Sequence, residues 1–331
     1  MRINKVLQKI GSGMDIEYEE SRGMFERFFA GELTPSQCGA LLMGLTGKGE
    51  TADELKAAVD SALDNALLVD DLDAVRIDTC GTGGDGQNSF NCSTAVAFFL
   101  ADMGYKVVKH GNRAVSSTCG SADIIQALNL PLLKDPQEVK KALATGNFAF
   151  IFAPHFHPSF AHVAPIRQEL GIRTIFNLMG PLLNPARPTH QILGVPKAEM
   201  APLMAEVLRK SQLKAAVVHG AGGFDELTPC GVCEVHLVSK GSSEIVELDP
   251  ASFDMKKCRP KDLACADKDA AVNMQKQILA GGGPTAVRDM VALNLGLALH
   301  LLDFDPRLEN CVTAARKTVE KGLQNPLPTA A

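Results

Sequence analysis

The N-terminal part of the chain repeats apolar positions with the period of a helix, and no strand pattern interrupts it before about residue 70. Residues 17–30 carry apolar side chains three to four positions apart, and Gly31 follows as a stop. A Thr-Pro pair and a Thr-x-x-Glu capping box predict further helices over 36–45 and 51–63. We therefore expect a small all-helical unit here.

From about residue 70 the pattern changes to apolar runs that alternate with helical stretches. Strands are predicted over 75–77, 106–108, 148–152 and 214–219, a hairpin over 232–238 and 244–248, and helices over 93–103, 121–128 and 136–145, with three more helices closing the chain. Residues 154–196 are rich in Pro and Gly and predict a loop-rich crossing between domains. The pattern predicts an α/β fold: a small all-helical N-terminal domain (1–71, joined by part of 160–190) and a larger α/β domain (72–331) with a mostly parallel central sheet flanked by helices.

Composition narrows the class of protein. The 331 residues are 46% hydrophobic and 21% charged, as in ordinary globular proteins. A net charge of −5 argues against a surface that coats nucleic acid, although it leaves room for a local phosphate pocket. The nine cysteines are an odd number in a chain that needs no disulfide framework. We expect a cytoplasmic protein without a secretory leader or a membrane helix.

A glycine cluster lies where the first strand should meet its helix, in DTCGTGGDGQNSFNCST, residues 78–94. Glycines let the backbone approach an anion, and the following helix start directs amide hydrogens at it. Gly81-x-Gly83-x-x-Gly86 also fits the dinucleotide fingerprint. However, the helix begins too late, and Lys109-His110 end the second strand where a nicotinamide cofactor would need a carboxylate.

Two more segments are expected at the same end of the sheet. KHGNRAVSSTCGSAD, residues 109–123, concentrates cations and hydroxyls that suit a phosphate. HGAGGFDE ends in adjacent carboxylates, Asp225 and Glu226, which are stable together on a cation such as Mg²⁺.

Other chemistry is weaker or missing. The sequence contains no P-loop and no Gly-x-Ser-x-Gly nucleophile elbow. Cys230-Gly-Val-Cys233 has the spacing of half a zinc site, but Cys258 and Cys265 do not complete it, so we expect buried thiols. His155 and His157 are interpreted as packing or substrate contacts.

Together, GTGGD, KHGNR with SSxxGSAD, and the late Asp-Glu pair resemble the anthranilate phosphoribosyltransferase family, within the nucleoside-phosphorylase-like phosphoribosyltransferases. The resemblance extends over GELTPSQCGALLMGLTGKGET and FAPHFHPSFAHVAPIRQELGIRTIFNLMGPLLNP, and so over nearly the whole chain. It implies transfer of the 5-phosphoribosyl group from phosphoribosyl pyrophosphate to the amine of anthranilate, with Mg²⁺, in tryptophan biosynthesis. It also implies a homodimer. One departure is Gly222, where many family members have an acid.

The resemblance implies the following roles. Phosphoribosyl pyrophosphate would be held by Gly81, Gly84, Asp85, Ser89, Asn91, Cys92, Ser93, Thr94, Lys109, His110, Gly111, Asn112, Arg113, Ala114, Val115, Ser116, Ser117 and Ser121. Anthranilate would contact Gly81, Asn112 and Arg167, and Mg²⁺ would be bound by Ser93, Asp225 and Glu226. No residue is a certain catalyst; Lys109 and Arg113 are expected to stabilise charge.

Two alternatives remain at this stage. A pyrimidine nucleoside phosphorylase shares the architecture but has a different phosphate loop. A non-catalytic, nucleic-acid-binding relative of the same fold would need a basic stripe.

Overall fold

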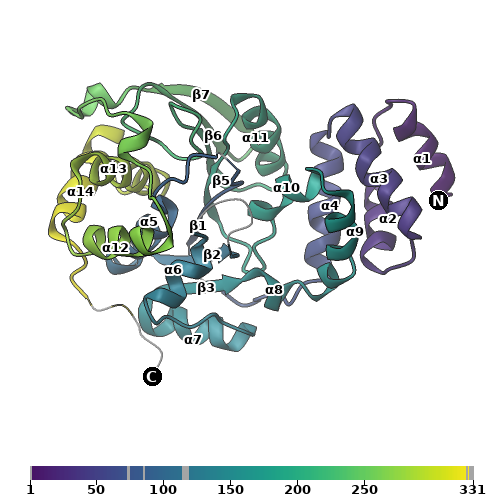
Figure 1. Ribbon diagram of the computed structural model, residues 1–331, viewed down its shortest axis with the longest axis horizontal. Helices are drawn as coiled ribbons and strands as arrows, with labels where there is room; N and C mark the ends of the chain where they lie inside the picture. Colours follow the sequence, from purple (N-terminus) through teal and green to yellow (C-terminus); the bar gives the residue numbers. More distant parts are fainter. Residues whose placement is uncertain (1, 73–74, 85, 114–118, 326, 328–331) are drawn as a thin grey trace.

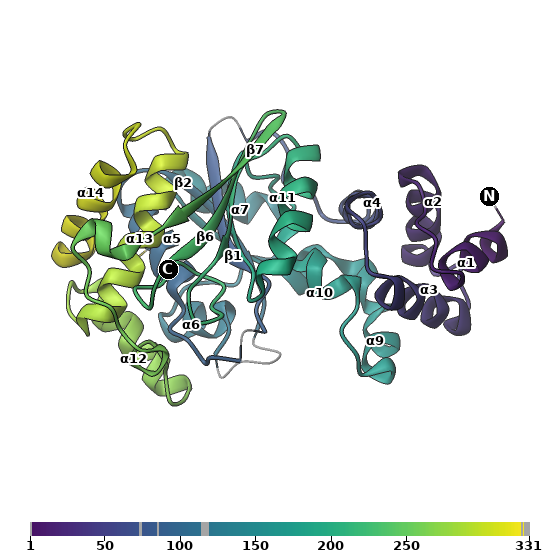
Figure 2. The same ribbon diagram turned by 90° about the horizontal axis from the view of Figure 1, so that it is seen from above.

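The structure is a computed structural model that describes residues 2–72, 75–84, 86–113, 119–325 and 327. Figures 1 and 2 show a bundle of N-terminal helices beside a larger unit of sheet and helices. The predicted fold class is confirmed: a helical bundle joins an α/β unit with a mostly parallel sheet. No helix in the described part of the chain is long and apolar enough to cross a bilayer.

Four helices form the N-terminal bundle. They are α1 (Ile3–Gly11), α2 (Tyr18–Phe29), α3 (Pro35–Lys48) and α4 (Ala52–Asp64). The capping interactions expected from the sequence are present: Thr34 and Thr51 each accept a hydrogen bond from the amide three residues on, and the side chain of that residue returns one. These bonds satisfy amides that would otherwise be unpaired at the helix starts.

The bundle shares its core with the segment that follows β3. This segment contains α8 (Ala153–Phe156), α9 (Ala164–Leu170) and α10 (Ile175–Met179). Phe29 stacks on Phe160 with ring centroids 5.4 Å apart, and Phe176 lies 5.7 Å from Phe28. Figures 1 and 2 show α10 between the N-terminal helices and the sheet, with α9 alongside the N-terminal helices. The division of the chain at residue 71 stays a prediction.

The central sheet has seven strands in the order β3-β2-β1-β4-β5-β6-β7. Their bounds are β1 Arg76–Gly81, β2 Lys106–Gly111, β3 Phe148–Phe152, β4 His190–Gly194, β5 Lys214–His219, β6 Cys233–Ser239 and β7 Ser242–Leu248. The pairs from β3 to β5 are parallel, and β6 and β7 add the expected antiparallel hairpin. The segment 154–196, expected to be a loop-rich crossing, contains one strand that the sequence pattern did not predict: β4, at the centre of the sheet.

Alternate residues of the strands enter different cores. Ala216 and Val218 of β5 belong to the core shared with the C-terminal helices, whereas Ala215 and Val217 belong to the core shared with the bundle. This alternation follows from the two-residue period of a strand. The helices of the α/β unit are α5 (Cys92–Asp102), α6 (Ser121–Ala127), α7 (Pro136–Gly146), α11 (Ala201–Lys210), α12 (Lys268–Leu279), α13 (Thr285–Leu301) and α14 (Leu308–Lys321).

The strand order places a crevice at the centre of the sheet. β1 leads outward to β2 and β3 on one side, and its other neighbour, β4, leads outward to β5. At such a reversal the loops after the two central strands turn apart, and ligands bind in the gap beyond their carboxyl ends. The glycine turn after β1 lies at this point.

Candidate functional site

Two glycines allow the loop after β5 to cross the ends of β4 and β1. Gly81 ends β1 and pairs with Gly194, which ends β4. A Cβ on Gly81 would collide with the carboxylate of Asp225, and one on Gly194 would collide with its carbonyl oxygen. The amide of Gly83 donates a hydrogen bond to Asp225 Oδ2 over 3.0 Å. The first and third predicted segments therefore meet at one point, as the sequence predicted.

The loop that carries Asp225 and Glu226 is held from both sides. The amide of Gly220 donates to the carbonyl of Phe224 at 2.9 Å. On the other side, Asn294 of α13 accepts from the Leu227 amide at 3.1 Å and donates to its carbonyl at 2.8 Å. These hydrogen bonds fix the backbone on both sides of Asp225 and Glu226. A fixed backbone orients carboxylates for binding a metal ion. Gln87 Nε2 also donates to the Gly222 carbonyl at 3.0 Å, a second link between the first and third segments.

Lys109 of β2 is buried beneath this crevice, with 2% of its surface exposed. Its ammonium donates to the carbonyl of Thr79 and to Ser93 Oγ, 3.1 Å away. Burial lowers the pKa of Lys109, and the charge of Asp78 opposes that shift. Lys109 forms no ion pair with a carboxylate in the described part of the chain. A buried cation that forms no direct ion pair favours an anionic ligand.

Asp78 is a buried acid near the candidate site to which the sequence analysis gave no role. Its carboxylate is fully buried in β1 and accepts hydrogen bonds from Asn184 Nδ2 at 2.8 Å and from the His110 amide. Burial raises the pKa of Asp78 to about 6, against the effect of Lys109. Its place in the first strand, ahead of the glycine cluster, is the signal that was available.

The start of α5 contributes hydroxyl and amide groups. Asn91 is the N-cap residue; its Oδ1 accepts from Thr94 Oγ1 at 2.6 Å, and its Nδ2 donates to the Cys119 carbonyl. Ser93 faces Lys109. The thiol of Cys92 contacts the carbonyl of Met290 in the core instead. Cys92 therefore brings its backbone, and not its side chain, to this helix start.

Ser89 and Ser121 belong to the first and the second predicted segment, respectively. Ser89 is joined to Ala264 by an isolated bridge, and Ser121 begins α6. Gly111, at the end of β2, has the Ser121 hydroxyl where a Cβ would stand, so the second segment folds back on itself. Asp85, Ala114, Val115, Ser116 and Ser117 lie outside the described residues.

Asn112 and Arg113 follow β2. The Asn112 carbonyl accepts from the Ala122 amide at 3.2 Å, which ties the loop to α6. The guanidinium of Arg113 lies 5.8 Å from the centre of the Phe152 ring and 3.6 Å from Asp123. Arg113 therefore already has a counter-charge, unlike Lys109.

Arg167 of α9 connects to the crevice through a row of rings. Its guanidinium lies 5.0 Å from the Phe176 ring centre. Phe176, Phe160, His157 and His110 then follow with successive centroids 5.6, 5.4 and 5.2 Å apart. The row ends at His110 of β2, so it links the second segment to the helical side of the molecule.

The charge along this row is confined to Arg167. Burial lowers the pKa of His157 to about 4 and that of His110 well below its ordinary value, so both rings are neutral at pH 7. Burial also lowers the pKa of Arg167, a guanidinium that forms no ion pair with any described residue. Uncharged rings can stack on an aromatic ligand, and a guanidinium without an ion pair can bind the carboxylate of that ligand.

Arg173 is a second residue that sequence reasoning missed. Its guanidinium occupies the position that a Cβ on Gly84 would take, and its carbonyl lies 3.5 Å from Thr46 Oγ1 of the bundle. Gly84 has a φ of +78°, so a larger residue would also be strained there. Arg173 thus places a cation from the bundle side on the glycine turn.

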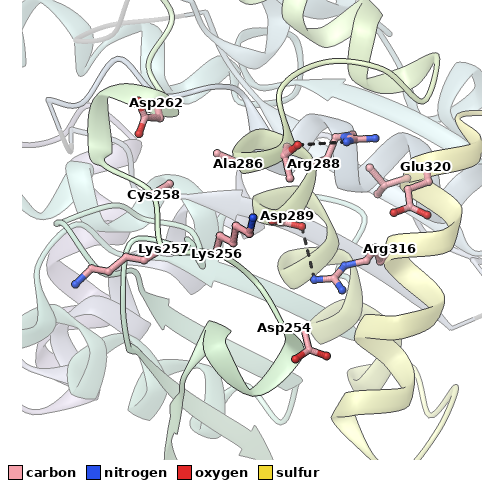
Figure 3. Close-up of a pocket in the computed structure, with 12 residues that line it drawn as sticks. Asp254, Lys256, Lys257, Cys258, Asp262, Ala286, Arg288, Asp289, Arg316 and Glu320 are labelled. Carbon is pink, nitrogen blue, oxygen red and sulfur yellow. Dashed lines mark hydrogen bonds and ion pairs between the residues drawn. The ribbon is translucent and has the colours of Figure 1, made fainter.

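A separate pocket of about 500 Å³ lies between residues 254–262, α13 and α14 (Figure 3). Acidic and basic side chains line it together, and Arg316 is 3.7 Å from Asp289 across it. None of the predicted site residues lines this pocket. The groups that converge at the ends of β1, β2 and β5 form a different site.

Comparisons with known proteins agree with this architecture. The glycosyl transferase family, helical bundle domain, matches residues 4–66, and the glycosyl transferase family, a/b domain, matches residues 73–324. The fold is thus that of a two-part glycosyl transferase.

Individual relatives narrow the family further. The anthranilate phosphoribosyltransferase of Nitratidesulfovibrio vulgaris is 51% identical over 96% of both chains, and that of Oleidesulfovibrio alaskensis is 48% identical over 97% of this chain and 98% of its own. The crystal structure of anthranilate phosphoribosyltransferase from Thermus thermophilus has a TM-score of 0.89 at 36% identity, covering 96% of this chain and 94% of that one. The chain belongs to the anthranilate phosphoribosyltransferase family.

A further solved structure shows the ligands of one relative. Anthranilate phosphoribosyltransferase from Saccharomyces cerevisiae, in complex with PRPP and Mg, has a TM-score of 0.79 at 29% identity and covers 87% of this chain and 82% of that one.

Proposed function

We propose that the chain transfers the 5-phosphoribosyl group of phosphoribosyl pyrophosphate to the amine of anthranilate and releases pyrophosphate, a step of tryptophan biosynthesis. The observation that carries the proposal is the contact between Gly83 and Asp225 at the end of β1. It is supported by the burial of Lys109 against Ser93 at the start of α5, and by the row of rings from Arg167 that ends at His110, the next residue of β2. A diphosphate site and a site for an aromatic acid would then lie at the ends of neighbouring strands.

The donor site is built for a diphosphate. The turn at Gly81–Gly84 lets phosphate oxygens approach the backbone, and the start of α5 directs amides toward them. Ser89, Asn91, Ser93 and Thr94 add polar groups, and the loop from Lys109 to Ser117 would complete the grip together with Ser121. Arg173 closes over Gly84 from the bundle side.

Mg²⁺ fits the oxygen donors on this side of the crevice. Asp225 and Glu226 provide carboxylates on an anchored loop, and Ser93 provides a hydroxyl beside Lys109. Mg²⁺ prefers such oxygens and keeps coordination positions for substrate phosphates. When bound, the ion would neutralise part of the diphosphate charge.

Anthranilate, the acceptor, has to be oriented by the protein, whereas its amine needs no deprotonation before it attacks. An arylamine is neutral at physiological pH, so no strong base has to act before it attacks. Arg167 would fork onto the anthranilate carboxylate, while Phe160, Phe176 and the neutral His157 provide flat walls. Asn112 and Gly81 would contact the acceptor from the sheet side. Holding the amine near the ribose supplies much of the acceleration.

The reaction exchanges one bond at ribose C1 for another. The C1–oxygen bond to pyrophosphate breaks, the C1–nitrogen bond to anthranilate forms, and the amine loses one proton. Negative charge grows on the leaving pyrophosphate as the bond breaks. Lys109 lies beneath the turn that holds it and stabilises this charge from a buried position, where the interaction is strong.

The test mixes the purified protein with phosphoribosyl pyrophosphate, Mg²⁺ and anthranilate. Loss of anthranilate fluorescence that requires all three, with one pyrophosphate released per anthranilate consumed, is the expected result. Unchanged fluorescence, together with phosphate-dependent cleavage of a pyrimidine nucleoside, would contradict the proposal. Omitting only Mg²⁺ should abolish turnover. Replacing Glu226 by Gln should lower turnover and change the Mg²⁺ concentration needed.

We further propose a homodimer formed through the helical domain, residues 1–71 with part of 160–190. The exposed side chains of Met14 and Met43 on this domain support an apolar contact. Light scattering coupled to gel filtration should give twice the chain mass of 35.2 kDa. Replacing both methionines by Lys should give the single-chain mass if the surface is correct.

A further inference from the structure

Two cysteine sulfurs are in contact at the edge of the pocket in Figure 3. Cys230 Sγ and Cys258 Sγ are 3.2 Å apart, although 28 positions separate them in the chain. The amide of Cys258 donates to the carbonyl of Pro229 at 3.0 Å, so the two backbones are also adjacent. The contact is therefore built by the main chain and not by one rotamer alone.

The other cysteines nearby are engaged elsewhere. The thiol of Cys233 lies against the amides of Ala221 and Thr228, at 3.4 and 3.5 Å. All nine cysteines are described and free, and no other pair of cysteine sulfurs is in hydrogen-bond contact. In the described part of the chain, no group of three or more His, Cys, Asp or Glu residues is arranged to bind a metal ion. The pair stands alone as a dithiol.

The two thiols differ in access. Cys230 is 8% exposed, whereas Cys258 is half-buried and lines the pocket, as Figure 3 shows. A small oxidant that enters the pocket reaches Cys258 first, and Cys230 stands directly behind it. This arrangement, one accessible thiol with a second one in contact, is what resolves a mixed disulfide within one chain.

We propose that Cys230 and Cys258 are an oxidation site, which a low-molecular-weight disulfide such as oxidised glutathione converts into an intramolecular disulfide. The sulfur of Cys258 attacks the oxidant, breaks its S–S bond and releases one glutathione thiol. The sulfur of Cys230 then attacks the Cys258 sulfur and releases the second. Two protein S–H bonds become one S–S bond, and the two electrons and two protons leave with the glutathione thiols.

The reduced pair is stable at neutral pH. Burial, together with the hydrogen bond and charge of Cys230, raises the pKa of Cys258 to about 12. Since the thiolate is the attacking form, the exchange is slow near neutrality and requires sustained exposure to oxidant. The pair is thus reduced in a reducing compartment and is converted only when oxidant accumulates.

The disulfide would connect two segments near the candidate site: the segment after Asp225 and Glu226, and the segment that begins at Cys258. Cys230 follows the anchored acidic pair by a few residues, and the segment after Cys258 runs along the donor loop. There, the Phe90 amide donates to Leu263 and the Cys265 amide donates to Asn88, both at 2.9 Å. A covalent link between these segments reduces the freedom of the unfolded chain and holds the walls together.

The test is oxidation of the full-length protein with excess oxidised glutathione at pH 8.5, followed by alkylation and peptide mapping without reductant. We expect a cross-linked peptide pair containing Cys230 and Cys258, two fewer free thiols than the nine of the reduced chain, and the loss of two hydrogens in mass. The apparent Tm should rise by about 3 °C or more. Dithiothreitol should reverse all four changes.

Variants separate this site from general thiol chemistry. In Cys258→Ser, the cross-linked peptide and the Tm rise should both disappear. Cys230→Ala should stop instead at the mixed disulfide on Cys258. The matched control is Cys265→Ser, a buried cysteine outside the pair, which should behave like wild type. A cross-link through other cysteines, a link between two chains, or unchanged thiols after prolonged incubation would overturn the proposal.

Discussion

The molecule has a buried lysine in each of its two parts, and the two are treated in opposite ways. In the bundle, the Lys48 side chain is 3% exposed and donates to Asp15 at 2.7 Å and to Glu54 at 2.8 Å. Although burial lowers its pKa, those hydrogen bonds raise the pKa of Lys48 above its ordinary value. In the sheet, Lys109 is buried as well, but its hydrogen bonds go to a carbonyl and a hydroxyl. The charges of Asp78 and Glu226 act on it without an ion pair in the described part of the chain, and burial lowers its pKa in spite of them.

The presence or absence of an ion pair distinguishes a lysine that stabilises the fold, Lys48, from one that is available to a ligand, Lys109. A charge whose counter-ions belong to the same chain is satisfied when the protein folds and is not available to a ligand. A buried charge without an adjacent partner costs stability until an anion arrives, and the anion then binds more strongly. The bundle therefore uses its lysine to hold helices together, whereas we propose that the lysine of the sheet binds the diphosphate.

The largest effect is expected from Lys109→Met. We predict a loss of about 10³-fold in kcat/KM for phosphoribosyl pyrophosphate, because the buried charge that stabilises the leaving group is removed. The Tm should stay within a few degrees, since no ion pair is broken. Steady-state kinetics and thermal unfolding would measure both. Full activity of this variant, or failure of the variant to fold, would contradict the view that Lys109 serves the reaction whereas Lys48 serves stability.

The mirror experiment is Lys48→Met. This change leaves the Glu54 carboxylate, which is fully buried, without its cation. We predict a fall of about 3 kcal/mol in the free energy of unfolding in urea, with kcat/KM unchanged for the folded protein. Adding Glu54→Gln to this variant should recover part of the loss, because the stranded charge is then gone. A double variant no more stable than the single one would contradict the explanation.

A smaller effect is expected at the second open cation, Arg167. Arg167→Ala should raise KM for anthranilate by about 30-fold, or about 2 kcal/mol, because a charge-assisted hydrogen-bond pair is lost. KM for phosphoribosyl pyrophosphate should not change. Arg167→Lys should recover only part of the affinity, since an ammonium lacks the planar fork. Equal changes in both KM values would argue for a structural role instead.

The smallest effect is expected at Arg173, which is exposed to solvent. Arg173→Ala should raise KM for phosphoribosyl pyrophosphate by about fivefold, or about 1 kcal/mol, as expected for a charge screened by water. Its neighbour Ile172, 43% exposed, provides the matched control as Ile172→Ala. If both variants changed KM alike, the effect would come from the loop and not from the guanidinium.

Local patterns were sufficient for most of the elements. The capping boxes at Thr34 and Thr51 and the hairpin of β6 and β7 depend on residues close together in the chain, so they could be predicted. β4 could not, because it has five residues, lies among prolines and glycines, and is paired on both sides. Its strand conformation is imposed by β1 and β5 more than by its own sequence.

The chemical groups of the site were likewise determined by the sequence: the glycine turn, the basic loop and the acidic pair. Only the tertiary structure decided which of them meet. Asp225 reaches Gly83 across 142 positions because the strand order puts β4 between β1 and β5 and glycines leave room above it. The row of rings from Arg167 to His110 likewise depends on packing between distant segments. So does the lack of an ion pair on Lys109 within the described residues. A window of sequence specifies local backbone preference, whereas counter-charges and contacts depend on the position of the whole chain.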